Sequence, residues 1–343
     1  MIFRKKHLLS LFIIIVIAYF LAAFQLPYYI YKPGAADELN PVVEVEGAFL
    51  SEGEMHLVTV SGGQATPLQY AWAMFLPHHE IRPLEDVRPD GITDDEYMHA
   101  QLQMMESSQQ ASTVVAYELA GQEINIEYNG VYVVSVMDDM PADGKLQMGD
   151  RIIGLDGDEI TEADDLINYV QGKEAEETIT VEFIREEETL EEIITLEALG
   201  ELDGQPGIGI QLVTDRGVAV NPEINFSSGR IGGPSAGLMF SLEIYDQLTE
   251  ADVTKGYAIA GTGEVDYEGN VYRVGGVDKK VVASDNKGID IFFAPNENGK
   301  VASNYHIALE KAEEIGTDME IVPIDTVEEA ISYLQDLETK NNL

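Results

Sequence analysis

The sequence contains no cysteine and has few basic residues. Without cysteine, the chain cannot form disulfides, use a thiol nucleophile or build a cysteine-containing zinc site. Only 20 Lys plus Arg oppose 62 Asp plus Glu, which gives 343 residues a formal net charge of −42. Such a surface repels phosphate groups, so we expect no nucleic-acid partner. The acidic excess favours solubility in a saline or alkaline medium.

Two further motif classes are absent. None of the six histidines stands in the HExxH spacing that places two metal ligands on one helical face. The pair His78 and His79, followed by Glu80, is interpreted as a surface loop, because adjacent side chains point in different directions. No GxxxxGK[ST] string occurs, which disfavours ATP hydrolysis. We therefore expect neither a metal nor a cofactor.

A long apolar run, "LLSLFIIIVIAYFLAAFQL", covers residues 8–26 after three basic residues. As a helix at about 1.5 Å per residue it would span about 28 Å, close to the apolar thickness of a bilayer. Tyr28, Tyr29 and Tyr31 would then form an interfacial aromatic belt. We expect residues 1–34 to form a cytoplasmic tip and a single-pass membrane anchor, with the following domains outside the cell. A cleaved signal peptide is the alternative.

The rest of the chain mixes strands and helices. Residues 40–62 alternate apolar and polar side chains, which predicts an antiparallel pair of strands. An amphipathic helix is predicted over about residues 95–120, with its Met and Leu side chains in the core. Residues 123–197 predict a five-stranded barrel with one helix. Mixed elements over residues 207–336 indicate an α/β or α+β domain.

The barrel block carries a family resemblance. The string "NGVY" at 129–132, the string "LQMGDRIIGLDG" at 146–157 and the helix after it resemble a PDZ domain. The resemblance implies a PDZ domain over residues 123–200 that binds an extended peptide as an added strand beside the helix, with a carboxylate held by backbone N–H groups. A barrel without a ligand is the alternative. The residues assigned to the peptide-binding groove are Asn129, Gly130, Val131, Tyr132, Leu166 and Val170.

Ser235 lies in "IGGPSAGLMF", where small residues precede an apolar run. Locally the pattern favours a helix N-cap, with a helix over about residues 235–248. A nucleophile at the same place would gain the helix dipole and backbone N–H groups suited to an oxyanion. Both interpretations are compatible with the local sequence.

A nucleophilic serine needs a base. His306, the only histidine after this motif, is predicted to lie in an ordinary amphipathic helix. Lys279 and Lys280 open a predicted helix in "RVGGVDKKVVAS". One of the two can face inward, where burial lowers the pKa of an amine toward neutrality, and the other should be solvated.

At these residues a second resemblance becomes specific. Five strings resemble the Lon protease proteolytic domain in order and near spacing: "GGPSAG" at 232–237, "GTGEV" at 261–265, "VGGVDKKVVAS" at 274–284, "KGID" at 287–290 and "APNEN" at 294–298. The resemblance implies a Ser-Lys dyad with Ser235 as nucleophile, Lys280 as base and Thr262 positioning the lysine. Gly232 replaces an acidic residue that often stands three before the serine. The backbone groups expected to bind the oxyanion belong to Gly233, Ser235 and Ala236.

The two resemblances together predict an α+β protein in which residues 40–121 and 205–343 form one protease domain, interrupted by the PDZ domain. The whole resembles the membrane-anchored Lon-like proteases of Gram-positive bacteria. That implies an ATP-independent endopeptidase acting on an extracytoplasmic peptide or protein, and suggests a homo-oligomeric ring. An anchored PDZ scaffold with an inactive protease domain is one alternative. A trypsin-like PDZ protease is the other, although its Gly-Asp/Asn-Ser-Gly-Gly order is not found here.

Overall fold

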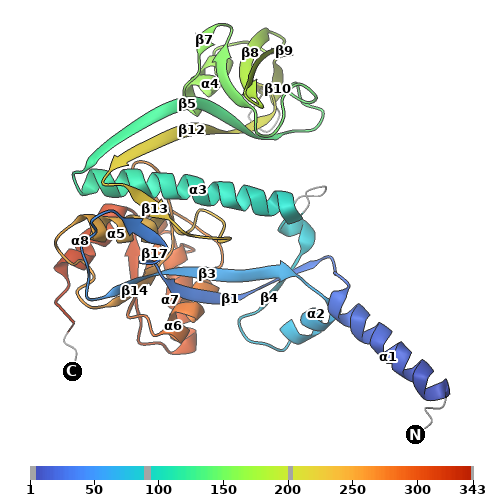
Figure 1. Cartoon of the computed structure of the whole chain (residues 1–343), viewed down its shortest axis with the longest axis vertical. Helices are drawn as coiled ribbons and strands as arrows, with labels where there is room; N and C mark the ends of the chain where they lie inside the picture. The colour runs from blue at the N-terminus through green and yellow to red at the C-terminus, as the bar shows by residue number, and fades with distance from the viewer. Residues whose placement is uncertain (1–4, 89–93, 200–203, 341–343) are drawn as a thin grey trace. The chain divides into compact units, whose positions relative to one another are not determined.

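A computed structural model describes residues 5–88, 94–199 and 204–340 (Figure 1). The chain forms two compact units. The first combines Met1–Glu123 with Asn221–Leu343, and the second is Ile124–Val220. The second unit is therefore inserted, in sequence, into the first.

A mixed six-stranded sheet forms the centre of the first unit, in the order β18-β17-β14-β3-β1-β4. Strands β18, β17, β14 and β3 run parallel, whereas β1 is antiparallel to both of its neighbours. All side chains of β17 are buried, as expected for a central strand covered on both faces. The strands are β1 Tyr28–Glu38, β3 Glu54–Gln64, β4 Glu80–Pro83, β14 Ala258–Gly261, β17 Ile291–Pro295 and β18 Glu320–Ile324.

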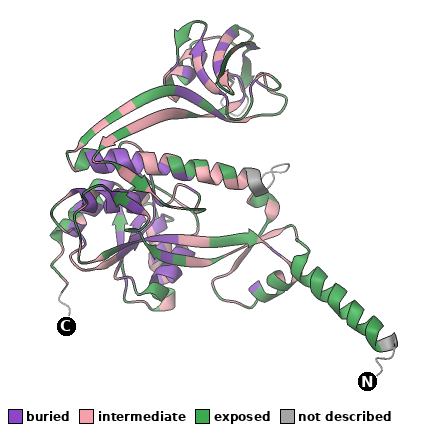
Figure 2. Ribbon diagram, in the orientation of Figure 1, coloured by how far each residue is buried: buried purple, intermediate pink, exposed green. Residues whose placement is uncertain are grey.

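Helices cover both faces of this sheet (Figure 1). Because side chains alternate along a strand, Val58, Ala260 and Phe292 share the face on which α6 and α7 pack. Helix α5 packs on β3 and β14 from the other face, and α3 and α8 pack against α5. Almost every side chain of α5 is buried (Figure 2). The helices are α3 Asp94–Leu119, α5 Gly237–Leu248, α6 Val277–Lys287, α7 Asn304–Ile315 and α8 Val327–Asp336.

Shorter elements complete the first unit. Helix α2 begins after Thr66, whose side chain forms a capping box with Gln69. Strand β13 pairs with β2, and β15 pairs with β16. The bounds are α1 Lys5–Ala23, β2 Val43–Val45, α2 Pro67–Ala73, β13 Ile224–Phe226, β15 Glu264–Val265 and β16 Val271–Tyr272, with short 3₁₀ turns at Leu84–Asp86 and Glu297–Gly299.

The second unit is a small barrel-like sheet with one helix. Its strand order is β12-β5-β6-β8-β9, and β7 pairs with β6. A separate apolar core, which includes Ile152, Val181 and Phe183, fills it. The elements are β5 Glu123–Val136, β6 Arg151–Leu155, β7 Asp158–Glu159, α4 Ala163–Gln171, β8 Thr178–Arg185, β9 Glu188–Thr195, β10 Glu197–Leu199, β11 Gln205–Gly207 and β12 Ile210–Asn221.

The strands near the N-terminus correct the sequence prediction. The residues assigned to an interfacial belt, Tyr28, Tyr29 and Tyr31, lie in β1 and pair with β3 and β4. The sheet of the first unit therefore begins within the range 1–34 that was assigned to the anchor. The two strands found in residues 40–62, β2 and β3, pair with other strands and not with each other, because an alternating pattern identifies a strand but not its partner.

Helix α1 contains most of the apolar run at the N-terminus. Its large apolar side chains are exposed from Leu8 to Leu21 (Figure 2). Among the residues that the structure describes, no helix is both long enough and apolar enough to cross a membrane.

Candidate active site

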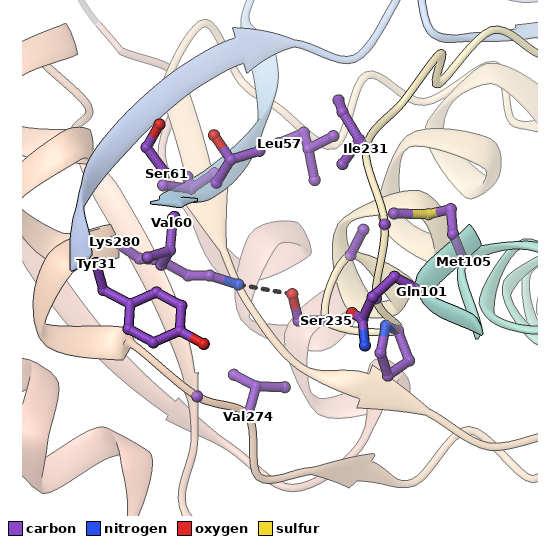
Figure 3. A pocket seen from close by; sticks show the side chains of 18 of the residues that line it. Tyr31, Leu57, Val60, Ser61, Gln101, Met105, Ile231, Ser235, Val274 and Lys280 are labelled. Carbon is purple, nitrogen blue, oxygen red and sulfur yellow. Dashed lines mark hydrogen bonds between the residues drawn. The ribbon is translucent and has the colours of Figure 1, made fainter. Parts of the chain in front are cut away.

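Ser235 lies in the turn that leads into α5. The helix begins at Gly237, its N-cap residue is Ala236, and no side chain caps it. The expected capping role of Ser235 is therefore wrong, because its side chain points to Lys280 instead (Figure 3). Its carbonyl oxygen accepts hydrogen bonds from Gly263 N at 3.1 Å and Thr262 Oγ1 at 3.0 Å. These bonds fix the turn against the loop that follows β14.

Three polar side chains from separate elements meet at this turn. Lys280 Nζ lies 2.7 Å from Ser235 Oγ and 2.7 Å from Thr262 Oγ1. Because the Thr262 hydroxyl donates to the Ser235 carbonyl, its oxygen accepts from the Lys280 amine. A neutral amine then has its lone pair available for the Ser235 hydroxyl proton.

The burial of Lys280 alters its protonation. The residue is 3% exposed, and this burial lowers the pKa of its amine from 10.5 to about 7. A lysine with such a pKa is largely neutral slightly above pH 7, whereas an exposed lysine is almost entirely charged there. The site therefore provides the unprotonated amine that a general base requires.

The neighbouring Lys279 has different surroundings. The expectation that it would be solvated is wrong, because it is also only 3% exposed. Its ammonium group forms ion pairs with Glu80 and with Asp278, at 3.0 Å from Asp278 Oδ2. Two carboxylates thus compensate the charge of Lys279, whereas Lys280 contacts two hydroxyl groups.

Two glycines allow the Ser235 turn to approach α3 closely. A Cβ at position 232 would lie 2.7 Å from Gln101 Cβ, so an acidic side chain cannot replace Gly232 without moving α3. Gly233 has a φ of +88°, a conformation that favours glycine, and its N–H donates to Gln101 O at 2.8 Å. The expectation that Gly233 would bind the oxyanion is therefore wrong. Among the described residues, none accepts a hydrogen bond from the amide of Ser235 or Ala236, so these two remain candidates.

The Ser235–Lys280 pair faces a cavity of about 640 Å³ within the first unit (Figure 3). Part of the cavity wall comes from the quoted motifs, and sequence reasoning missed the rest because most of those segments are far away in the chain and carry no recognisable motif. In the described parts of the chain, no histidine lines the cavity. Glu264 of the "GTGEV" string also lines the cavity. The lining residues outside the quoted motifs include Tyr31, Gln101, Met105, Arg230 and the β3 segment 57–62.

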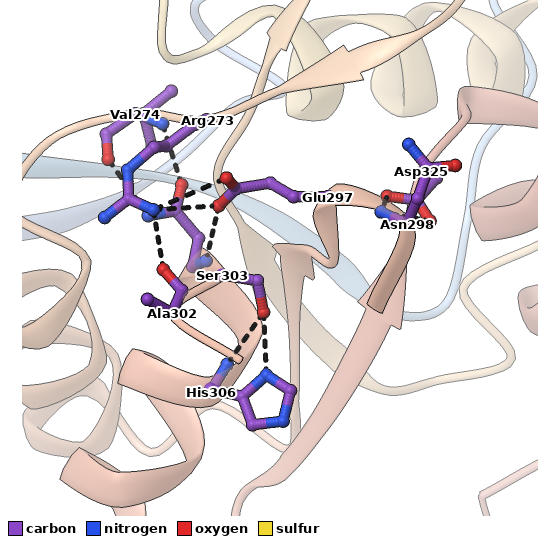
Figure 4. A network of polar contacts seen from close by, with 9 residues as sticks. Arg273, Val274, Glu297, Asn298, Ala302, Ser303, His306 and Asp325 are labelled. Carbon is purple, nitrogen blue, oxygen red and sulfur yellow. Dashed lines mark hydrogen bonds and ion pairs between the residues drawn. The ribbon is translucent and has the colours of Figure 1, made fainter. Parts of the chain in front are cut away.

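The histidines weighed as catalytic or metal-binding groups lie elsewhere. His306 is in α7, where its Nδ1 is 2.8 Å from Ser303 Oγ, beside a network in which Arg273 Nη1 contacts Glu297 Oε1 at 3.1 Å (Figure 4). The ring of His79 contacts the carbonyl of Pro77 at 2.9 Å. Both arrangements are local polar contacts.

The predicted peptide-binding residues of the second unit need correction. The segment 129–132 is part of β5 and not a loop, with Val131 and Tyr132 paired to Ile152 and Arg151. The N–H of Gly130 donates to Thr161 O at 3.1 Å, and Val131 is fully buried. Asn129, in the same strand, is exposed to solvent. The segment therefore does not form the expected carboxylate-binding loop, because it is a strand and the Gly130 amide is already bonded to Thr161.

The helix side of the predicted groove is also different. Leu166 and Val170 in α4 are 3% and 5% exposed and belong to the apolar core of the second unit. The expectation that they would face a groove is wrong, because their spacing of four places both on the buried face of the helix. Ile167 is the large apolar side chain of α4 that is exposed.

Two family models match parts of the chain. Residues 223–335 match the model of the Lon protease (S16) C-terminal proteolytic domain. The chain carries a Lon-type serine protease domain. Residues 102–196 match the model of the PDZ domain. The two expected family resemblances are thus confirmed.

Curated relatives of the Lon-type domain are themselves called Lon protease. One from Metamycoplasma arthritidis (strain 158L3-1) is 33% identical over 109 residues, which are 32% of this chain and 12% of that protein. One from Aster yellows witches'-broom phytoplasma (strain AYWB) is 29% identical over 102 residues, 30% of this chain and 12% of that protein. The chain spans about an eighth of the length of these relatives.

A comparison with solved structures also found similar proteins. The PDZ domain of an SdrC-like protein from Listeria monocytogenes is 37% identical to this chain. The alignment covers 25% of this chain and 90% of that one, with a TM-score of 0.24.

The lowered pKa of Lys280 predicts the pH dependence of peptide cleavage. Because the neutral amine is the active form, kcat/KM should rise with pH through an apparent pKa of about 7 and fall about tenfold per pH unit below it. The measurement is kcat/KM on a fluorogenic peptide between pH 5.5 and 9. Glu264→Gln is the control, because burial raises the pKa of this carboxyl, which also lines the cavity. This variant should show the same rise of kcat/KM with pH as the wild type. If the apparent pKa of kcat/KM changes in Glu264→Gln, the titrating group is the Glu264 carboxyl and not the Lys280 amine.

The two hydrogen bonds of Thr262 predict that it positions the lysine. Thr262→Val keeps the shape but removes the hydroxyl, so kcat should fall about tenfold while KM changes little. Thr262→Ser should restore most of the activity. Thr113→Val is the matched control, because Thr113 is a buried threonine whose hydroxyl donates to the Gln109 carbonyl within α3. Equal losses in both valine variants would indicate a general effect on folding.

Proposed function

We propose that the chain is a serine endopeptidase in which Lys280 is the general base for Ser235. The observation that supports this most is the 2.7 Å contact between Ser235 Oγ and a lysine whose burial lowers its pKa to about 7. Neutral Lys280 takes the hydroxyl proton as Ser235 attacks a peptide carbonyl. The amides of Ser235 and Ala236 receive the oxyanion, and protonated Lys280 then gives its proton to the leaving amine. Water hydrolyses the acyl-enzyme by the reverse sequence of proton transfers.

The cavity wall supports an extended peptide as the substrate. Strand β3 pairs with β14 only through Leu57, whereas its other edge pairs with β1 as far as Gln64. The β3 residues beyond Leu57 that line the cavity therefore have one edge unpaired among the described strands. An extended peptide can add to this edge and present its carbonyl to Ser235.

Two alternatives fit the site less well. An inactive PDZ scaffold does not need the contacts that join Ser235, Thr262 and Lys280. A trypsin-like mechanism needs a histidine beside the serine, and no described histidine lines the cavity.

We further propose that cleavage is independent of ATP, since the sequence has no phosphate-loop motif. The PDZ unit would dock substrate or a partner, and a homo-oligomeric ring is the proposed assembly.

The decisive experiment compares variants of Ser235 and Lys280 with a variant of a serine outside the cavity. Ser235→Ala should fold normally and lose peptide cleavage by about 10⁴-fold or more, since it removes the nucleophile. Lys280→Arg should be similarly inactive, because a guanidinium stays protonated. The readouts are cleavage of a casein-derived peptide without ATP and labelling by a fluorophosphonate probe. Ser303→Ala is the matched control, because Ser303 is a buried serine outside the cavity. Cleavage or labelling that persists in Ser235→Ala would refute the assignment.

We also propose that residues 8–26 attach the chain to the cytoplasmic membrane, with the protease domain outside. The exposed apolar side chains of α1 and the basic residues before them support this proposal. The full chain should sediment with membranes after a carbonate wash, and protease added to intact cells should degrade it. A variant without residues 1–26 should appear in the soluble fraction. Recovery of the full chain as a soluble cytoplasmic protein would contradict the proposal.

A further inference from the structure

A buried histidine outside the candidate active site has no hydrogen-bond partner in the part of the chain that the structure describes. His56 in β3 is 0% exposed, yet neither Nδ1 nor Nε2 forms a hydrogen bond with a described residue. Buried polar groups without a partner are costly and uncommon. The two ring nitrogens of His56 are therefore available to a ligand that the described chain does not itself supply.

Two carboxylates lie around this ring. Glu54 precedes His56 by two residues in β3, so both side chains are on the same face of the sheet. Glu38 in β1 is directly opposite His56 in the strand register. His56 Nε2 lies 3.6 Å from Glu54 Oε2, and one potential ligand atom from each of the three residues lies within 4.8 Å of the others.

We propose that Glu38, Glu54 and His56 form a binding site for a divalent transition metal of the Zn²⁺ type. One imidazole and two carboxylates are the ligand types that Zn²⁺ accepts, with water as the fourth ligand. Ligand atoms of a tetrahedral Zn²⁺ site lie about 3.3 Å apart, close to the present separation of the His56 and Glu54 atoms. Glu38 and Glu54 have exposed side chains, which can rotate to complete the coordination. Oxygen-preferring Mg²⁺ and Ca²⁺ fit this ligand set less well.

A cationic side chain already occupies part of this region. Lys287 Nζ, at the C-terminal end of α6, lies 3.4 Å from Glu38 Oε1. The ammonium group would compete with a metal for Glu38 and repel it. The end of a helix dipole at this point favours positive charge, so a metal that displaces the lysine remains in a favourable field.

The position of the proposed metal site indicates a structural role in the first unit. It would join β1 to β3 next to β14, where His56 pairs with Ala260, two residues before Thr262. It would also lie at the end of α6, the helix that carries Lys280. The site is separate from the Ser235–Lys280 cavity, since none of its three ligands lines that cavity. Metal binding should therefore stabilise the fold that holds the dyad.

The test uses the full chain without a histidine tag, treated with chelator and titrated with ZnCl₂ alone. Calorimetry should show one Zn²⁺ per chain. At a Zn²⁺ concentration about 100 times Kd, Tm should rise by about 5–10 °C. Glu54→Gln, at an exposed position, should weaken binding at least tenfold, and His56→Gln should abolish it. Lys287→Gln should tighten binding.

His78→Gln combined with His79→Gln is the matched control, because these histidines also adjoin a carboxylate, that of Glu80, but are partly exposed. This double variant should bind Zn²⁺ as the wild type does. Three outcomes would overturn the proposal: no Zn²⁺ binding by the wild type, unchanged binding in Glu54→Gln and His56→Gln, or loss of binding in the control. Equal Tm shifts with CaCl₂ that survive in Glu54→Gln would likewise overturn it, since they indicate general screening of the acidic surface. Because binding and Tm are measured without a substrate, failure here leaves the proposed peptidase activity unaffected.

Discussion

The proposed active site depends on the burial of one amine next to one hydroxyl group. Lys280 has lost its water without gaining a carboxylate partner, so burial shifts its equilibrium toward the neutral form. Removing the amine from water lowers the free energy of unfolding. The packing of the sheet and helices in the first unit offsets this loss. In a chain with 62 acidic residues, keeping carboxylates away from this amine is the main constraint on the site.

The architecture satisfies that constraint by separating two adjacent lysines. The start of α6 directs Lys279 to Glu80 and Asp278, and Lys280 to the turn before α5. Helices α5 and α6 lie on opposite faces of the sheet, so their N-terminal ends meet at the edge where β14 ends. The loop after β14 brings Thr262 between them, and its hydroxyl bonds to both partners.

Much of the site was predictable because the relevant motifs are local. The strings around Ser235, Thr262 and Lys280 identified the proteolytic domain, and the sequence predicted the amphipathic helices α3 and α7. Failures occurred where one short pattern fits two structures. The tyrosines that follow the apolar run suit either a membrane interface or a strand, and a serine before an apolar run suits either a cap or a nucleophile.

The sequence by itself determined the two domain types and the residues that we propose as the dyad, because these depend on residue type and spacing along the chain. Only the tertiary structure decided which atoms those residues contact. It assigned the Gly233 amide to α3, placed Leu166 and Val170 in a core, and brought His56 next to Glu38 from another strand. The physical reason is that hydrogen-bond partners, burial and hence pKa are properties of groups that meet in space, and strand pairing brings together residues that no local pattern connects.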